Sequence, residues 1–317
     1  MDNRPIGVFD SGVGGLTVLS EIIHLLPDEN TVYFGDTLRF PYGPRDLSQV
    51  RHFVFKITEF LTEKNVKMLV VACNTSTAAA LEDLKNNLGI PVIGVIEPGA
   101  RTAVNNTKSN RVGLIATKGT VDSRAYEIAV KNINPKIRLF SYAAPRLVEL
   151  IEAGILVGRE LEEIIKGYVD PLIKENIDVL ILGCTHFPLI ENQILLKYSS
   201  DFKVISSAVE TAKDVKSTLG KLRLQNEKTG SRRVTETKGD KSCGCAVNNA
   251  RNGNDKDIGS ANGTSDTGGS SVGSGSRSLK GPVRLYYETG NASKFLEVGR
   301  MFLGEKINEV IRVSLDI

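Results

Sequence analysis

The sequence lacks long apolar runs and a large net charge of either sign. Its longest apolar runs have the length of a strand, far below the ~20 residues that a membrane-spanning helix needs. The 317 residues carry a formal net charge of +3, and the lysines and arginines are scattered along the chain. A site for nucleic acid or for an anionic membrane is therefore not indicated.

A signal for export is also missing from the beginning of the chain. The strand-like segment Ile6–Phe9 comes almost at once, without the order of basic, apolar and small residues that marks a signal peptide. We therefore expect a cytoplasmic protein. In a reducing cytosol its four cysteines are not expected to form disulfides, so each is a buried side chain, a metal ligand or a catalytic group.

What the sequence does contain is a regular alternation of short β-branched runs and amphipathic stretches. This alternation predicts an α/β protein with parallel sheets covered by helices on both sides. The predicted strands are Ile6–Phe9, Thr31–Phe34, Lys67–Ala72, Pro91–Val95, Arg111–Ile115, Lys136–Phe140, Asp178–Leu182 and Lys203–Ile205. The predicted helices are Leu16–Leu26, Leu47–Lys64, Thr75–Leu88, Arg124–Asn132, Arg146–Ala153, Glu160–Lys174 and Leu189–Lys197.

A change of composition begins near residue 226. Residues 226–278 are rich in Gly, Ser, Asn, Asp, Thr and Lys and contain no aromatic residue, which predicts a disordered insertion. Cys243 and Cys245 fall inside it, where an incidental pair is favoured over a metal or redox site. A strand at Val283–Tyr287, a helix at Ala292–Leu303 and a strand near Val310–Leu315 follow. This tail needs a partner sheet, so the insertion interrupts a domain.

A faint internal repeat relates two parts of the chain. Residues 6–11 resemble residues 112–117, and residues 69–75 resemble residues 180–186. Each copy is a strand that ends in small or hydroxyl-bearing residues. The repeat predicts two similar parallel-sheet α/β domains that face each other across a central cleft with pseudo-twofold symmetry. Chance similarity between two generic α/β segments is the alternative.

The predicted domain boundaries follow from the repeat and the tail. The first domain comprises residues 1–98 and 207–317, and the second comprises residues 99–206. Because ligands of open α/β sheets bind at the carboxyl ends of strands, the cleft is the expected site.

Cys73 and Cys184 each lie where a predicted strand ends and a helical segment begins. Good capping residues follow Cys73, and Pro188, after Cys184, suits a first helical turn. The positive end of a helix dipole favours a thiolate, so we expect a lowered thiol pKa and a usable base. Two cysteines at equivalent positions of the repeat indicate catalysis rather than burial alone.

Two turns lie near these cysteines in the predicted fold. Residues 10–15, Asp-Ser-Gly-Val-Gly-Gly, lack the Lys-Ser/Thr of a Walker loop and the glycine spacing of a dinucleotide fingerprint. An acid beside backbone N–H groups suits a ligand with both an ammonium and a carboxylate, and a tight turn capped by Asp10 is the alternative. Gly35-Asp36 with Pro41-Tyr42-Gly43 predicts a second turn, which fits a structural role and a ligand clamp equally.

His186 is the histidine placed to act with a cysteine, two residues after Cys184. It could orient or protonate groups near the thiol, whereas His24 and His52 lie in amphipathic helices and are expected at the scaffold or surface. A zinc site built from Cys73, Cys184 and His186 is an alternative that no closely spaced ligand pair supports.

Taken together, the motifs resemble those of glutamate racemases, in the aspartate/glutamate racemase superfamily. The resemblance covers nearly the whole chain outside the insertion, which follows Leu224 and departs from the family pattern. The motifs that carry it are residues 9–15 (FDSGVGG), 35–36 with 41–43 (GD and PYG), 72–75 (ACNT), 116–121 (ATKGTV), 183–189 (GCTHFPL), and 287–290 (YETG) with Phe295.

The resemblance implies a racemase that needs no cofactor or metal and uses two bases. Cys73 would act on D-glutamate and Cys184 on L-glutamate, assisted by Asp10 and His186, which would also contact the substrate. The expected partner is glutamate, the product D-glutamate would serve peptidoglycan synthesis, and a homodimer is usual. Ser11, Asn74, Thr75 and Thr185 would hold the amino and α-carboxylate groups, and the Tyr42-Gly43 backbone the side-chain carboxylate.

Three other functions stay open on the sequence. An aspartate racemase would keep the cysteine pair and differ in its pocket. A hydrolase built on Cys184 and His186 would form a covalent acyl intermediate and would not need Cys73. A non-catalytic binding protein would use the insertion as an interaction tail, so deleting the insertion would abolish its activity.

Overall fold

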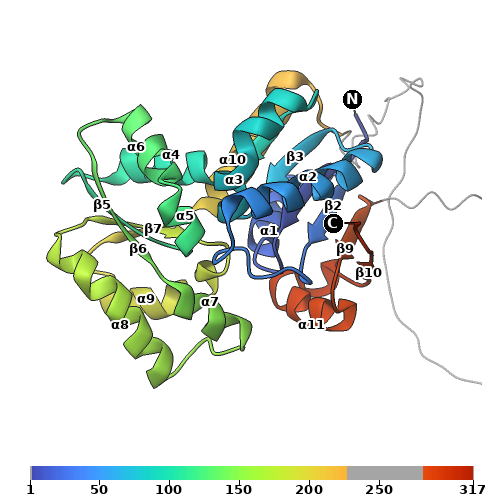
Figure 1. The fold of residues 1–317 in the computed structure, drawn as a ribbon. Helices are drawn as coiled ribbons and strands as arrows, with labels where there is room; N and C mark the ends of the chain where they lie inside the picture. Colours follow the sequence, from blue (N-terminus) through green and yellow to red (C-terminus); the bar gives the residue numbers. More distant parts are fainter. Residues whose placement is uncertain (1, 227–280, 317) are drawn as a thin grey trace, which may run out of the picture. The chain divides into compact units, whose positions relative to one another are not determined.

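The computed structural model describes residues 2–226 and 281–316, and its strands form two parallel sheets (Figure 1). The strands are β1 (Ile6–Asp10), β2 (Thr31–Gly35), β3 (Met68–Val71), β4 (Val92–Gly94), β5 (Arg111–Ala116), β6 (Arg138–Ala143), β7 (Val179–Gly183), β8 (Lys203–Ser206), β9 (Arg284–Glu288) and β10 (Ile311–Arg312). One sheet has the order β10-β9-β2-β1-β3-β4 and the other β6-β5-β7-β8. The predicted fold class is confirmed.

The four strands β2-β1-β3-β4 of the larger sheet have the same order as β6-β5-β7-β8 of the smaller sheet, as the internal repeat predicts. β1 lies between β2 and β3, and β5 lies between β6 and β7. In both sheets the order reverses at these central pairs, which is where open α/β sheets bind ligands. The exact domain boundaries stay a prediction, although the strands up to Gly94 and those after Gly281 belong to one sheet and β5–β8 to the other.

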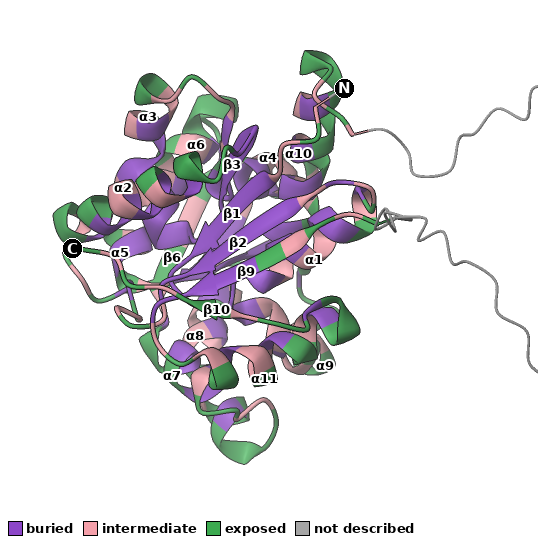
Figure 2. Ribbon diagram, turned by 90° about the vertical axis from the view of Figure 1, so that its right-hand side faces the viewer, coloured by how far each residue is buried: buried purple, intermediate pink, exposed green. Residues whose placement is uncertain are grey.

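Helices cover both faces of the sheets, and alternate strand residues enter different cores. Ile6 and Val8 of β1 pack in one apolar cluster, whereas Phe9 packs in the cluster on the opposite face. Figure 2 shows the resulting burial of β1, β2 and β3. None of the helices in the described ranges is long and apolar enough to cross a membrane.

The helices are α1 (Leu16–Leu25), α2 (Leu47–Glu63), α3 (Asn74–Asn87), α4 (Ile96–Asn106), α5 (Lys118–Asp122), α6 (Ala125–Ile133), α7 (Pro145–Glu152), α8 (Arg159–Lys174), η1 (Phe187–Ile190), α9 (Glu191–Tyr198), α10 (Ser207–Leu222), α11 (Ala292–Leu303) and η2 (Gly304–Lys306).

Several elements differ from the sequence prediction. Helices α4, α5 and α10 were not predicted. In α4, Pro98 and Gly99 favour a turn by composition, but the proline lies in the first turn of the helix, where it is tolerated. Strand β10 is limited to two residues, and β6 is displaced toward the C-terminus of its predicted range. β6 is also partly exposed, because it lies at a sheet edge.

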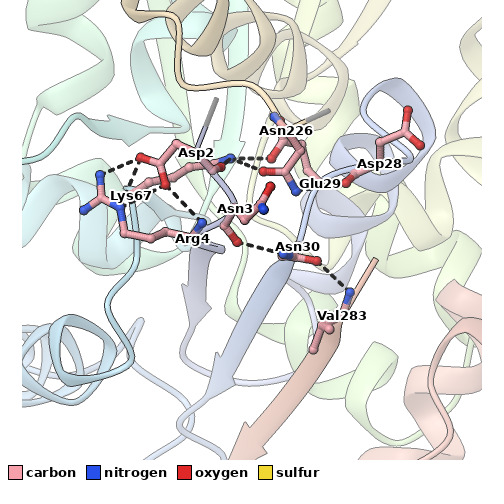
Figure 3. Close-up of polar contacts among 9 residues, drawn as sticks. All are labelled: Asp2, Asn3, Arg4, Asp28, Glu29, Asn30, Lys67, Asn226 and Val283. Atoms are coloured by element: carbon pink, nitrogen blue, oxygen red, sulfur yellow. Dashed lines mark hydrogen bonds and ion pairs between the residues drawn. The ribbon is translucent and has the colours of Figure 1, made fainter. Parts of the chain in front are cut away.

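A buried polar cluster closes the amino end of the larger sheet (Figure 3). Lys67, just before β3, donates to Glu29 Oε2 at 2.5 Å, to Asn226 Oδ1 at 2.8 Å and to the Asp2 carbonyl at 2.7 Å. Lys67 is fully buried and Glu29 is 3% exposed. The cluster therefore joins the N-terminus, the turn before β2 and the end of the segment that follows α10.

The C-terminal residues 281–316 return to the larger sheet, which confirms the prediction that they need a sheet to pair with. Asn226 is the last described residue before the gap at residues 227–280, and Val283 lies shortly after that gap. Both bind the turn before β2, Asn226 through Glu29 and Val283 through Asn30. β9 then pairs with β2 in parallel (Figure 1). Asn226 is the one residue of the predicted insertion that the structure describes. Residues 227–278, with Cys243 and Cys245, lie outside the described residues.

Candidate active site

A cavity of about 280 Å³ is lined by residues that follow the central strands of both sheets. Ser11 and Cys73 follow β1 and β3, and Thr117 and Cys184 follow β5 and β7. The two thiols therefore reach one cavity from equivalent positions of the two sheets. Of the predicted substrate-binding residues, Tyr42, Gly43, Asn74, Thr75, Thr185 and His186 also line it.

Cys73 caps α3 with its own side chain. Its Sγ accepts a hydrogen bond from the Ser76 amide at 3.4 Å and lies 3.8 Å from Ser11 Oγ. Burial and the nearby Asp10 carboxylate raise the pKa of this thiol to about 12, although the hydrogen bonds to Ser76 and Ser11 lower it. The predicted lowering of the Cys73 pKa is thus wrong for this structure, because desolvation outweighs the helix N-terminus.

Cys184 has a different setting. The α-helix expected after it begins only at Glu191, and the short η1 comes first, with its proline in the first turn. The predicted helix dipole is therefore not directly available to this thiol. Cys184 Sγ instead lies 3.7 Å from Nδ1 of His186.

His186 connects this thiol to a carboxylate. Its Nε2 lies 2.6 Å from Glu152 Oε1, at the end of α7, and the His186 side chain is 3% exposed. Burial lowers the pKa of His186, but the hydrogen bonds with Cys184 and Glu152 outweigh burial and raise the pKa well above its usual value of 6.5. The imidazole of His186 thus lies between the Cys184 thiol and the Glu152 carboxylate.

Asp10 lies behind the cavity and is not among its lining residues. Its fully buried carboxylate accepts hydrogen bonds from the Gly12 amide at 2.9 Å and from Thr185 Oγ1 at 3.3 Å. Burial raises the pKa of Asp10, while the charge of His186 and these hydrogen bonds oppose the rise. In this arrangement Asp10 contacts Thr185, which lines the cavity, and influences Cys73 through its charge.

Gly14 allows the loop after β1 to come close to the loop after β7, which carries Cys184. A Cβ at this position would lie 2.6 Å from Thr185 Oγ1 and 2.7 Å from His186 Nδ1, closer than real side chains approach. The glycine-rich turn was predicted to let the backbone approach a ligand. At Gly14 the close neighbour is the loop after β7, so this glycine serves the contact between the two sheets' loops.

The second predicted turn has a structural role, and its role as a ligand clamp stays a prediction. Asp36 is buried and accepts hydrogen bonds from the Tyr42 hydroxyl, from Arg39 and from Thr289. These contacts hold the turn, while Tyr42 and Gly43 line the cavity.

Sequence reasoning missed Glu152 and did not single out Thr117. Glu152 is one of many acidic residues and lies on a distant helix, so no local signal marks it as the partner of His186. Thr117 follows β5 as Ser11 follows β1, and its hydroxyl lies 2.9 Å from that of Thr75. The internal repeat was the signal that could have singled it out.

The other two histidines are not among the residues that line the cavity. His24 and His52 are exposed, in agreement with the expected scaffold or surface role. Across residues 2–226 and 281–316, no three His, Cys, Asp or Glu side chains are grouped as metal ligands.

Comparisons with known proteins agree on one family. The Asp/Glu/Hydantoin racemase family matches residues 6–215. A curated glutamate racemase of Bacillus cereus is 48% identical over 225 residues, which cover 71% of this chain and 84% of the relative. The crystal structure of the glutamate racemase RacE1 of Bacillus anthracis superposes with a TM-score of 0.79 at 35% identity, covering 100% and 99% of the two chains. That of the Francisella tularensis glutamate racemase, solved in complex with D-glutamate, gives a TM-score of 0.78 at 32% identity, covering 100% and 99%.

Proposed function

The chain belongs to the Asp/Glu/Hydantoin racemase family, and from this we propose that it is a glutamate racemase, an isomerase that interconverts L- and D-glutamate. We propose further that Cys73 and Cys184 are its two bases and that it needs no cofactor. The names of the similar proteins support glutamate as the substrate. The observation that carries the two-base mechanism is that both thiols line one cavity, each from the loop after an equivalent strand.

The chemistry needs one base and one acid on opposite sides of the α-carbon. From L-glutamate, the Cys184 thiolate takes the α-hydrogen as a proton and leaves a carbanion-like centre. The Cys73 thiol then delivers its proton to the other face, which forms D-glutamate and leaves a Cys73 thiolate. After the product leaves, Cys184 releases its proton to solvent and Cys73 takes one up, which restores the first state, and no redox partner is required because no electrons are gained or lost.

The surroundings of the thiols support this direction of proton flow. Burial and Asp10 raise the pKa of Cys73, which suits the proton donor. The raised pKa of His186 favours an imidazolium, whose positive charge lies beside Cys184. When D-glutamate is the substrate, its ammonium group near Cys73 would oppose the charge of Asp10 and make the thiol more acidic.

The polar residues of the cavity would hold the charged groups of glutamate. We assign the amino and α-carboxylate groups to Ser11, Asn74, Thr75 and Thr185, and the side-chain carboxylate to the backbone at Tyr42 and Gly43. The assignment rests on the family motifs, and its support is that these six residues line the cavity. The same resemblance supports a homodimer and a role of the product in peptidoglycan synthesis.

The proposed function is tested by incubating the protein with L-glutamate in deuterated water without any added cofactor. We expect D-glutamate to appear with deuterium at the α-carbon, because its proton comes from a thiol that exchanges with solvent. The same assay with L-aspartate separates the two racemase activities. Faster turnover of aspartate, or D-glutamate without α-deuterium, would overturn the proposal.

A further inference from the structure

Tyr126 on α6 makes a buried hydrogen bond to Asn74, the first residue of α3. The Tyr126 hydroxyl donates to Asn74 Oδ1 at 2.8 Å, and the two residues are 1% and 2% exposed. α6 covers the smaller sheet and α3 the larger one, so this bond links side chains of the two halves. Tyr126 itself is not among the residues that line the cavity.

The amide nitrogen of Asn74 is left with an open donor. Asn74 lines the cavity, and its buried Nδ2 has no hydrogen-bond partner among the described residues. An Asn amide has an acceptor and a donor that exchange places when the group turns over. Because Tyr126 holds the acceptor, the donor is kept on the other side, and a buried donor without a partner is costly.

Ser207, the first residue of α10, lies beside the Tyr126 hydroxyl. Burial and the nearby Cys184 raise the pKa of Tyr126, while a hydrogen bond from the Ser207 side chain lowers it. Because Asn74 Oδ1 can only accept, the single proton of the Tyr126 hydroxyl goes to Asn74, and the tyrosine oxygen is left to accept a hydrogen bond from Ser207. Gly99 on α4 gives these groups room, since a Cβ there would lie 3.2 Å from Ser207 Cβ and 3.3 Å from the Tyr126 oxygen.

We propose that Tyr126, supported by Ser207, is a positioning residue that fixes the Asn74 amide so that Nδ2 donates to a carboxylate oxygen of the substrate. An N–H group can bind only an acceptor, so the ammonium group of an amino acid is excluded as its partner. The proposal rests on the proposed function, which assigns Asn74 to substrate binding. It deepens that function by naming the residues that hold the amide in place.

The test is a double-mutant cycle of Tyr126→Phe and Asn74→Ala, read out as KM and kcat for glutamate. Tyr126→Phe keeps the ring and lets the amide turn over, so we expect KM to rise about ten-fold and kcat to change less than about three-fold. In the Asn74→Ala background the same substitution should leave KM unchanged. Tyr286→Phe is the matched control, because that buried hydroxyl binds the Lys306 carbonyl and does not line the cavity.

Equal effects of Tyr126→Phe on KM with and without Asn74 would overturn the proposal, as would an unchanged KM in the single variant. If Tyr126→Phe does not fold, Ser207→Ala enters the same cycle, with a smaller rise in KM that also disappears without Asn74. Calorimetric binding of D-glutamate repeats the cycle without turnover. Failure of racemisation by the unaltered chain would therefore count against the proposed function, and failure of the binding cycle against the role of Tyr126.

Discussion

The buried polar groups at the two ends of β3 differ in how many of their hydrogen bonds are made. At the amino end, each of the three protons of Lys67 can meet one of its three acceptors (Figure 3). At the carboxyl end, Cys73 and Asn74 line a cavity, and Asn74 Nδ2 has no partner in the described residues. A short strand of four residues thus separates a completed cluster from an incomplete one.

This difference indicates that the amino end of β3 contributes to stability and the carboxyl end to function. A buried charge whose bonds are all made holds chain segments together, and removing one member leaves the other unpaired. A buried donor without a protein partner is costly to folding, and a ligand can satisfy it. We therefore expect substitutions at the amino end of β3 to change the free energy of unfolding, and those at the carboxyl end to change catalysis.

The largest effect is expected from removing either thiol. Cys73→Ala and Cys184→Ala should each lower the rate of glutamate racemisation by about 10³-fold or more, because proton transfer then lacks its acid or base. The rate is measured by circular dichroism from both enantiomers. A Cys184→Ala protein with unimpaired racemisation would refute the two-base mechanism.

Cys73→Ser is the matched control for the structural role of Cys73. The thiol caps α3, and serine is a good capping residue, so this variant should retain the unfolding free energy of the unaltered chain. Its hydroxyl is a much weaker acid than a thiol, so racemisation should remain lost. An active Cys73→Ser protein would show that the cap matters and the thiol does not.

A large effect on stability is expected at the other end of β3. Lys67→Met leaves Glu29 as a buried carboxylate without its cation, which should lower the free energy of unfolding by about 3–5 kcal/mol. Urea denaturation measures the loss, and kcat/KM of the folded fraction should stay within about two-fold. Adding Glu29→Gln should recover part of the stability, whereas no recovery would show that the ion pair is not the cause.

A smaller, pH-dependent effect is expected at the His186–Glu152 pair. The pKa of His186 is raised above its unfolded value, so the stability that the pair contributes is full below pH 6.5 and is lost as pH rises through the folded pKa. Glu152→Gln should therefore cost about 1 kcal/mol near pH 6, and less at higher pH. Denaturation from pH 5.5 to 9 measures the difference.

Glu149→Gln provides the comparison for Glu152, because Glu149 lies on the same helix and pairs with Arg146 at the surface. Its effect on the free energy of unfolding should not follow the titration of a buried histidine. If both variants gave the same pH profile, or if the cost of Glu152→Gln grew with pH, the assignment to His186 would be wrong.

The strand ends of the site could be predicted because their signals are local. Short apolar runs that alternate with amphipathic stretches predicted β1 to β5, β7 and β8 within a few residues. The motif residues that follow β1, β3 and β7 line one cavity or contact the residues that line it. Helix α10 escaped prediction, because its buried face uses alanine and threonine among its contacts rather than a strong apolar stripe. At Pro98 the composition of a turn was overridden by packing of α4 on its neighbours.

By itself, the sequence determined the α/β class, the repeat and the residues at the strand ends, since all three depend on patterns within short segments. Only the tertiary structure decided that Glu152 meets His186, that Tyr126 holds Asn74 and that the pKa of Cys73 is raised. These properties depend on which distant side chains approach within hydrogen-bond distance and on how much water the fold removes. Desolvation and charge act across space, so no spacing along the chain contains them.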